Sequence, residues 1–224
     1  MKKIIVISLG GSLIVPDKIN LKFLEEFKKI LLKNIKKNKF IIVCGGGNTA
    51  RIYINGIKDK ILYQSLIGIA STRFNAKFMT YFFEKNSNKV IPRDMTEVEN
   101  LIKKHDLIFC GALRYAKNET SDATATKLAR YFNTEFINLS DVAGLYDKNP
   151  KKFKNAKFIP EISSREFLKV AKKTGFTPGQ HFILDKKAAK TIHKYNIPAY
   201  LLGPNLKNLD NLLNNQHFIG TVIS

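Results

Sequence analysis

Two glycine clusters, each directly after a short apolar run, are the part of this sequence best suited to binding a ligand. Residues 10–12 (GGS) follow the run KIIVISL, and residues 45–47 (GGG) follow the run KFIIVC. Glycine allows a tight turn and exposes bare amide groups, and a helix that follows adds the positive end of its dipole, so the expected ligand is phosphate. Neither cluster has the spacing of a Walker loop or of a dinucleotide-binding loop. Another class of phosphate site is therefore expected.

Polar residues farther along the chain add groups that suit phosphoryl transfer. This reaction needs little covalent chemistry from the protein, but it needs positive charge and amide donors placed around the transferred group. Arg51, shortly after the second glycine cluster, carries a permanent planar charge that matches phosphate oxygens. Asp122 and Asp185 stand at the starts of predicted helices, where a carboxylate often caps the first turn. The residues alone leave open a surface salt bridge for Arg51 and simple helix caps for the two aspartates.

The elements that must position these residues can be read from the alternation of short apolar runs with amphipathic stretches. This alternation predicts an α/β fold with a mostly parallel sheet covered by helices. Strands are expected at residues 3–9, 40–44, 89–91, 106–110, 135–139, 199–202 and 220–223. Both glycine clusters then lie at carboxyl ends of strands, where α/β sheets build their sites. A length of 224 residues with 44% apolar content suits one domain over residues 1–224.

An ordered set of motifs resembles the amino acid kinase superfamily, and within it most closely the UMP kinases of archaeal type. The motifs are GGS at 10–12, GGGxxAR at 45–51, TRxNA at 72–76, TSDA at 120–123 and SDVAGLYxxNP at 140–150. The match continues to residues 219–223 and covers essentially the whole chain. It implies a three-layer αβα sandwich, transfer of the γ-phosphoryl group of ATP to UMP in pyrimidine nucleotide biosynthesis, Mg²⁺ with the ATP, and a homo-oligomer, hexameric in many relatives.

The resemblance also implies roles for individual residues. ATP would be bound by Gly11, Ser12, Gly47, Arg51, Ser140, Asp141, Tyr146 and Asn149. The acceptor nucleotide would be bound by Gly46, Ser65, Thr120 and Ser121. Apart from the resemblance, Arg114 and Lys117 of the altered acceptor loop are expected to pair with the UMP phosphate. Asp122, Arg51 and Asp185 would be catalytic, with Asp122 organising the reacting groups and Asp185 steering a phosphate-binding lysine. The four histidines lack metal-ligand spacing, so no metal site made of side chains is expected.

The chain departs from the family pattern at several positions. Ser8 stands where many superfamily members carry a lysine, although archaeal-type UMP kinases also tend to lack it. Ser65 stands where UMP kinases usually have an aspartate that holds the ribose, and the acceptor loop at 111–123 is longer than usual. Ala143 replaces an acid in the ATP segment. These departures keep two alternatives open: a kinase of the same fold for another small acceptor, and a nucleotide-binding protein that has lost catalysis.

The composition bears on partners and compartment. With 38 Lys and Arg against 18 Asp and Glu, the net charge of +20 attracts polyanions. The lysines are scattered over almost every predicted helix, which favours a solvated surface over a dedicated nucleic-acid surface, the third alternative. Two cysteines cannot build a disulfide framework, and no signal-peptide or membrane-span pattern is present. A cytoplasmic protein without a membrane partner is expected.

Overall fold

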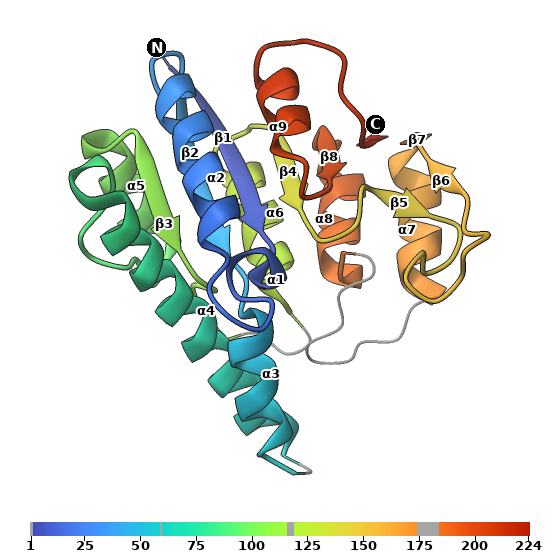
Figure 1. Cartoon of the computed structure of the whole chain (residues 1–224), viewed down its shortest axis with the longest axis horizontal. Coiled ribbons are helices and arrows are strands. Elements are labelled where there is room, and N and C mark those ends of the chain that lie inside the picture. Colours follow the sequence, from blue (N-terminus) through green and yellow to red (C-terminus); the bar gives the residue numbers. More distant parts are fainter. Residues whose placement is uncertain (1, 59, 116–118, 174–183) are drawn as a thin grey trace.

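The computed structural model describes residues 2–58, 60–115, 119–173 and 184–224. In these residues seven strands form one sheet in the order β3-β2-β1-β4-β8-β9-β7 (Figure 1). Their bounds, in that order, are Leu107–Cys110, Asn38–Cys44, Lys3–Leu9, Phe136–Leu139, Ala199–Leu202, Thr221–Ile223 and Glu161–Ile162. Every neighbouring pair is parallel except β8 and β9. The predicted mostly parallel sheet is confirmed.

Helices cover both faces of the sheet and make the predicted three-layer sandwich (Figure 1). One face packs against α5 (Met95–Lys104), α6 (Ser121–Tyr131), α7 (Ser164–Lys173) and α8 (Lys186–Tyr195). The other packs against α1 (Gly11–Ile14), α2 (Leu21–Asn34), α4 (Ile61–Phe83) and α9 (Leu206–Leu213). Alternate residues of β1 enter opposite cores, Val6 on the first face and Ile5 and Ile7 on the second. The buried, continuous apolar strands are therefore explained by a sheet that is covered twice.

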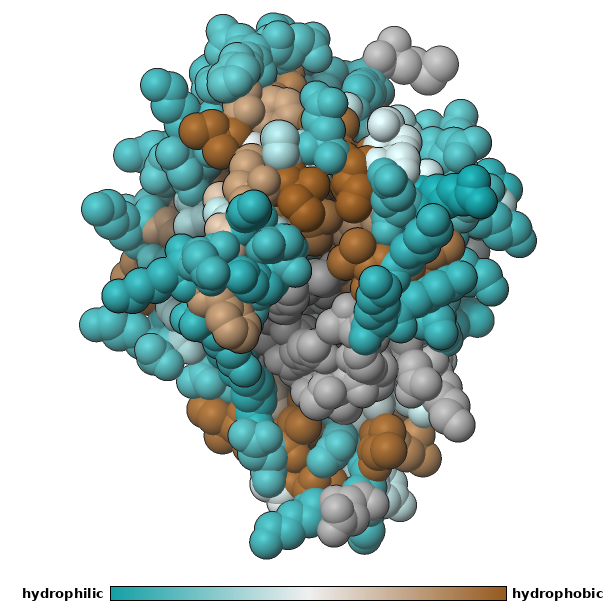
Figure 2. Space-filling view, turned by 90° about the vertical axis from the view of Figure 1, so that its right-hand side faces the viewer, coloured by the Kyte–Doolittle hydropathy of each residue, from teal (hydrophilic) through white to brown (hydrophobic). Residues whose placement is uncertain are grey.

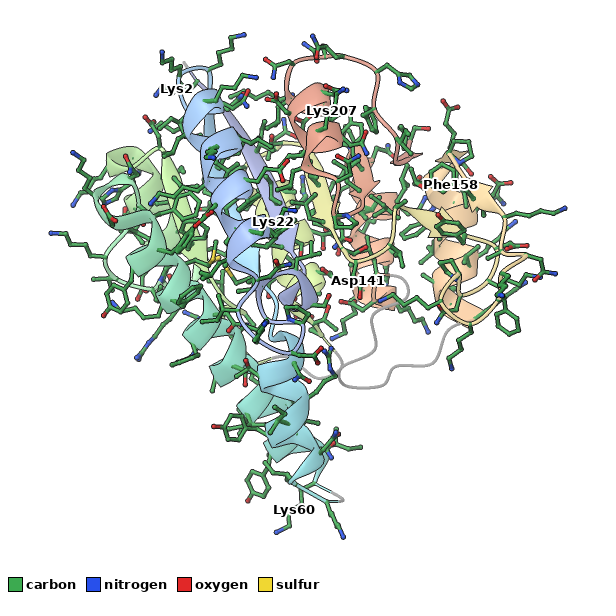
Figure 3. All side chains as sticks on the ribbon, viewed as in Figure 1. Lys2, Lys22, Lys60, Asp141, Phe158 and Lys207 are labelled. Carbon is green, nitrogen blue, oxygen red and sulfur yellow. The ribbon has the colours of Figure 1, made fainter. Side chains whose placement is uncertain are left out.

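Smaller elements complete the described part of the chain. Helix α3 (Gly47–Asn55) packs along α4, and a short 3₁₀ turn, η1 (Glu84–Asn86), follows α4. Strands β5 (Leu145–Tyr146) and β6 (Phe158–Ile159) form a separate antiparallel pair. No helix in the described residues is both long and apolar enough to cross a membrane. Lysine side chains extend outward from most helices, without gathering on one of them (Figure 3).

The strand predicted at residues 89–91 does not form, and that prediction is wrong. The side chain of Asn88 explains the difference, because it pairs with β3 as a strand backbone would. Its Nδ2 donates to the carbonyl oxygen of Phe109 (2.9 Å), and its Oδ1 accepts from the N–H of Phe109 (2.7 Å). One amide side chain therefore satisfies both backbone groups of Phe109 at the edge of β3, and residues 89–91 add no strand there.

Candidate active site

The two glycine clusters meet because β1 and β2 are parallel neighbours in register. Leu9 lies opposite Cys44 at the ends of the strands, and the N–H of Gly45 donates to the carbonyl oxygen of Leu9 (2.8 Å). A Cβ on Gly11 would lie 2.0 Å from the nitrogen of Gly47, which itself has φ +61°. Both positions therefore require glycine. The two glycine clusters therefore form a surface of backbone atoms without side chains, and α3 begins at this surface.

A buried amide on α4 holds the second glycine cluster in place. The Nδ2 of Asn75 donates to the carbonyl oxygens of Gly45 (2.8 Å) and Gly46 (3.1 Å), and only 2% of the residue is exposed. Asn75 belongs to the TRxNA motif, for which no role is predicted from the sequence. An amide in the middle of a helix, where it is a weak helix former, is the signal that could have identified it.

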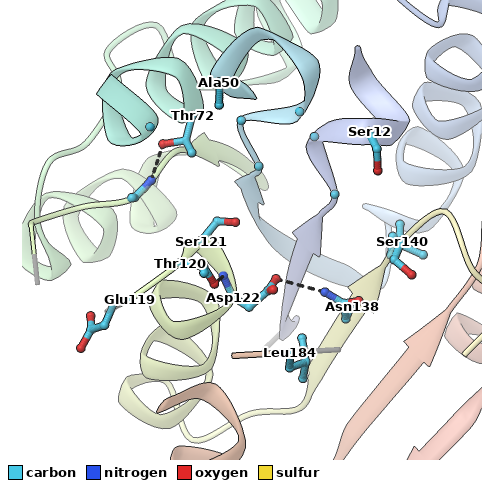
Figure 4. A pocket seen from close by; sticks show the side chains of 18 of the residues that line it. Ser12, Ala50, Thr72, Glu119, Thr120, Ser121, Asp122, Asn138, Ser140 and Leu184 are labelled. Carbon is cyan, nitrogen blue, oxygen red and sulfur yellow. Dashed lines mark hydrogen bonds between the residues drawn. The ribbon is translucent and has the colours of Figure 1, made fainter. Parts of the chain in front are cut away.

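The same motif fixes the start of the loop after β3. The hydroxyl of Thr72 accepts from the N–H of Ala112 (2.9 Å; Figure 4), and the guanidinium of Arg73 donates to the carbonyl oxygens of Ala112 (3.0 Å) and Leu113. Removal from water lowers the pKa of Arg73, and nearby Arg93 adds to this effect. Helix α4 therefore joins the glycine loop after β2 to the acceptor loop after β3.

Replacing Asn75 with Ala should destabilise the protein by about 2–3 kcal/mol, because two buried carbonyl groups lose their donor. Urea unfolding measures this change, and the nucleotide affinity should fall with it. Thr80 is a suitable control, since it is also buried on α4 but its hydroxyl bonds only within the helix, to the carbonyl oxygen of Lys77. Thr80→Ala should destabilise less and leave nucleotide affinity unchanged. Equal effects of the two substitutions would contradict the assigned role of Asn75.

Asp122 lies at the start of α6 and faces the ends of β1 and β4. Its Oδ1 accepts from the hydroxyl of Ser8 (2.6 Å) and from the Nδ2 of Asn138 (3.1 Å; Figure 4). The pKa of Asp122 is raised to about 6, chiefly by burial and also by the nearby carboxylate of Asp185, while the hydrogen bonds from Ser8 and Asn138 limit the rise. A carboxylate that changes charge near neutral pH at a strand end is typical of a functional site. Asn138 is a site residue that the sequence did not single out.

Asp185 connects the beginnings of α6 and α8. Its Oδ2 accepts from the hydroxyl of Thr120 (2.5 Å), and its Oδ1 accepts from the N–H groups of Lys187 (2.8 Å) and Ala188 (2.9 Å). The hydroxyl of Thr120 also accepts from the N–H of Asp122 (3.1 Å) and caps α6. The helix cap considered for Asp185 is therefore present. The same carboxylate also helps to position Asp122, because the hydroxyl of Thr120 bonds to both Asp185 and the N–H of Asp122.

These elements enclose a pocket at the carboxyl edge of the sheet (Figure 4). Of the predicted site residues, the structure brings the following together in its lining: Gly11, Ser12, Gly46, Gly47, Ser65, Thr120, Ser121, Asp122, Ser140 and Asp141. Glu119, Asn138 and Leu184 also line it. Within the described residues the lining includes the acidic side chains of Glu119, Asp122 and Asp141 and no basic side chain.

Other predicted site residues are placed away from this lining. Arg114 pairs with Asp94 (3.0 Å) and its side chain is 78% exposed. The ring of Tyr146 packs edge-on against another ring of the β5–β6 pair, and Asn149 accepts from the N–H of Lys151 (2.9 Å). Arg51 lies on α3 and is not a lining residue. Lys117 lies outside the described residues.

Known proteins resemble this chain, in sequence and in fold, over almost its whole length. The uridylate kinase of Thermoplasma volcanium is 32% identical, covering 100% of this chain and 98% of the relative. The uridylate kinase of Methanococcus aeolicus is 30% identical, covering 98% and 99%. The crystal structure of uridylate kinase from Archaeoglobus fulgidus superposes with a TM-score of 0.84 at 29% identity and covers 100% of both chains.

A model of a whole protein family also matches this chain. The model described as "Amino acid kinase family" matches residues 3–203, which include both glycine clusters, Asp122 and Asp185. The two relatives that cover almost the whole chain are both named uridylate kinase. The chain belongs to the amino acid kinase family.

Proposed function

We propose that this protein is a UMP kinase that transfers the γ-phosphoryl group of ATP to UMP and releases ADP and UDP. The observation that carries the proposal is the single pocket in which two glycine clusters face the start of α6 with its buried aspartate. Similarity to uridylate kinases over the whole chain supports the choice of acceptor. We also propose that residues 1–224 form one domain.

The reaction joins two anionic groups, so the site must hold them close and neutralise charge. A phosphate oxygen of UMP bonds to the γ-phosphorus of ATP, and the bond from that phosphorus to the β–γ bridging oxygen breaks, so ADP leaves. The amides of Gly11 and Ser12 would lie along the transferred group, Gly46 by the acceptor phosphate and Gly47 by the donor phosphates. These roles fit a floor of bare backbone at which α3 begins.

Mg²⁺ would enter with ATP and neutralise part of its charge. Oxygen ligands suit this ion, and the carboxylate of Asp122, which lines the pocket, would offer one such oxygen. No group of three or more His, Cys, Asp or Glu side chains that could hold a metal occurs among the described residues. This donor set fits an ion bound mainly through phosphates and water, as expected for a nucleotide-borne Mg²⁺.

The part of the pocket formed by α4 offers neutral hydrogen-bonding groups for the acceptor. The hydroxyl of Ser65 donates to the carbonyl oxygen of Ile61 (2.8 Å), and the Nε2 of Gln64 donates to that of Ile57 (2.7 Å). Both side chains line the pocket and keep oxygen atoms that can accept from a ligand. Because Ser65 is neutral, a kinase for another small acceptor is the second candidate.

A coupled assay of ADP release with Mg·ATP and a panel of nucleoside monophosphates tests the function. We expect turnover with UMP at least about 100-fold faster than with AMP, GMP or CMP, a difference that corresponds to about 3 kcal/mol of transition-state discrimination. Faster turnover with another acceptor would support the second candidate. No turnover by folded protein that binds ATP would contradict both.

We further propose a cytoplasmic homo-oligomer, with a hexamer as the expected form. Large apolar side chains are exposed on α3 and α4, namely Ile52, Tyr53, Ile61, Leu62, Tyr63, Leu66, Phe74 and Tyr81. Figure 2 shows hydrophobic atoms exposed among hydrophilic ones at the lower end of the molecule, where these two helices project. Such a surface is typical of contacts between protein chains. The two cysteines are free and buried, as is usual in a reducing compartment.

A further inference from the structure

One side of α4 lines the pocket from the second glycine cluster toward the projecting end of the molecule (Figure 1). Thr72, Gly68 and Gln64 belong to this lining and are four residues apart, so they lie along one side of the helix. The inner end is close to Gly46, because a Cβ on Gly46 would lie 3.7 Å from the Cβ of Ser71. Gln64 comes seven residues before Ser71, which is about 10 Å along the helix axis. A nucleoside monophosphate with its phosphate at Gly46 would therefore bring its base to Gln64.

A hydrogen bond fixes the orientation of the Gln64 amide. The Nε2 of Gln64 lies 2.7 Å from the carbonyl oxygen of Ile57, just after the end of α3. A carbonyl oxygen can only accept, so the NH₂ group of the amide must be the end at Ile57. The side chain of Gln64 is half-buried and lines the pocket. Its Oε1 is therefore the end of the amide that is free of this bond and can accept from a ligand.

The pocket lining around Gln64 suits a flat ring. Ile54 of α3 and Ile69 of α4 line the pocket there, and Ile54 is only 9% exposed. Gly68 adds a stretch of helix without a side chain, and a Cβ on it would lie 3.5 Å from the Cδ1 of Ile54. Apolar walls with a few polar groups are typical of sites that bind small molecules, and those polar groups set the specificity. The amide of Gln64 is such a group.

We propose that the Oε1 of Gln64 accepts a hydrogen bond from the N3–H of uracil, and that this contact makes the site prefer UMP to CMP. Cytosine has no hydrogen on N3, and this nitrogen can only accept. To donate to it, the amide would have to turn over, which would bring its oxygen against the carbonyl oxygen of Ile57. Either arrangement leaves acceptors facing each other, and a site rejects an analogue strongly when its polar groups stay unpaired. This inference rests on the proposed kinase function for the identity of its ligand.

The competing explanation is that Gln64 only joins α4 to the end of α3. Gln64→Met separates the two explanations, because it keeps the length of the side chain and removes both its donor and its acceptor. The ratio of kcat/KM for UMP to that for CMP should fall at least about tenfold, mainly through slower reaction of UMP. A purely structural link would lower both values by the same factor. Gln64→Lys keeps a donor for the carbonyl oxygen of Ile57 but has no acceptor, so the ratio should fall in this variant as well.

Ser65→Ala is the matched control, because Ser65 is the next residue of the lining but is expected at the ribose, which UMP and CMP share. Its ratio should stay within about threefold of that of the unchanged protein, whatever the loss of rate. Ratios within about threefold in both Gln64 variants would overturn the proposal. Thermal unfolding of each variant tests for misfolding, and Gln64→Lys serves if Gln64→Met does not fold.

Calorimetry with UMP and CMP makes the same comparison without turnover. The preference for UMP in binding should also fall at least about tenfold in the Gln64 variants. Preferential binding of UMP that depends on Gln64, without its phosphorylation, would contradict the proposed function and support the contact with the base. Phosphorylation of UMP with a preference that does not depend on Gln64 would overturn only the contact. Folded protein that binds neither nucleotide would overturn both.

Discussion

Replacing Asp122 with Asn should reduce the rate of UMP phosphorylation by at least about 100-fold, the scale seen when a single preorganised group of an active site is removed. The substitution keeps an oxygen that can accept from the hydroxyl of Ser8 and the amide of Asn138, as the Oδ1 of Asp122 does. It removes the negative charge and replaces the other carboxylate oxygen with an NH2 donor. Steady-state kinetics with Mg·ATP and UMP measure the loss. A rate within threefold of the unchanged protein would exclude a catalytic role for the charge.

The same substitution should stabilise the fold, which separates loss of charge from loss of structure. Burial raises the pKa of Asp122 to about 6, above the value of an exposed aspartate, so the folded state binds the proton more tightly than the unfolded state. Stability therefore falls as pH rises from about 4 to 6 and stays lower above that range. At pH 8 the Asn variant should gain up to about 3 kcal/mol in the free energy of unfolding, with a smaller gain at pH 5.

The pH dependence of the unchanged enzyme offers a further readout of this charge. If the ionised form of Asp122 is the active one, kcat/KM should fall as pH drops through about 6. Asp106→Asn is a matched control, because Asp106 lies before β3, pairs with Lys2 and Lys39, and is far from the pocket lining. It should leave the rate and its pH profile unchanged and alter stability by less than about 1 kcal/mol. An unchanged pH profile in Asp122→Asn would contradict the assignment.

The sheet was predictable because its strands are buried on both faces. Runs such as residues 3–9 and 199–202 are almost continuously apolar, and the observed β1 and β8 have these bounds. The strand expected at 89–91 failed because Asn88 pairs with β3 through its side chain, an effect that apolar patterning does not register. Strands of two residues, such as β7, are too short to give any pattern.

The backbone part of the site was predictable for a similar local reason. Glycines that follow strands mark the edge where a site forms, and both glycine clusters line the pocket. Contacts between distant side chains leave no such local signal. Arg114, expected at the acceptor phosphate, pairs with Asp94, the N-cap residue of α5. The approach of Glu119 to Lys187, 68 residues later in the chain, depends on how α6 packs against α8.

Replacing Gly11 with Ala should have the largest effect on the fold of the site. The new Cβ would lie 2.0 Å from the nitrogen of Gly47 and 2.7 Å from the carbonyl carbon of Gly45. These are backbone atoms of the neighbouring loop, so no side chain can rotate away and the two glycine clusters must separate. We expect a loss of about 3 kcal/mol or more in the free energy of unfolding, together with loss of detectable nucleotide binding.

Gly56→Ala tests whether this effect is specific to the contact between the loops. Gly56 ends α3 with φ −72°, which any residue adopts, and its nearest neighbour to a new Cβ is the carbonyl oxygen of Tyr53 at 3.4 Å. Its substitution should change stability by less than about 1 kcal/mol and leave nucleotide binding intact. Urea unfolding and ADP calorimetry on both variants make the comparison. If Gly11→Ala has the same stability in urea and the same ADP affinity as Gly56→Ala, the two loops can separate freely. The phosphate site would then not depend on their close contact, and the amides of Gly11 and Gly47 could not both be required to hold the transferred group.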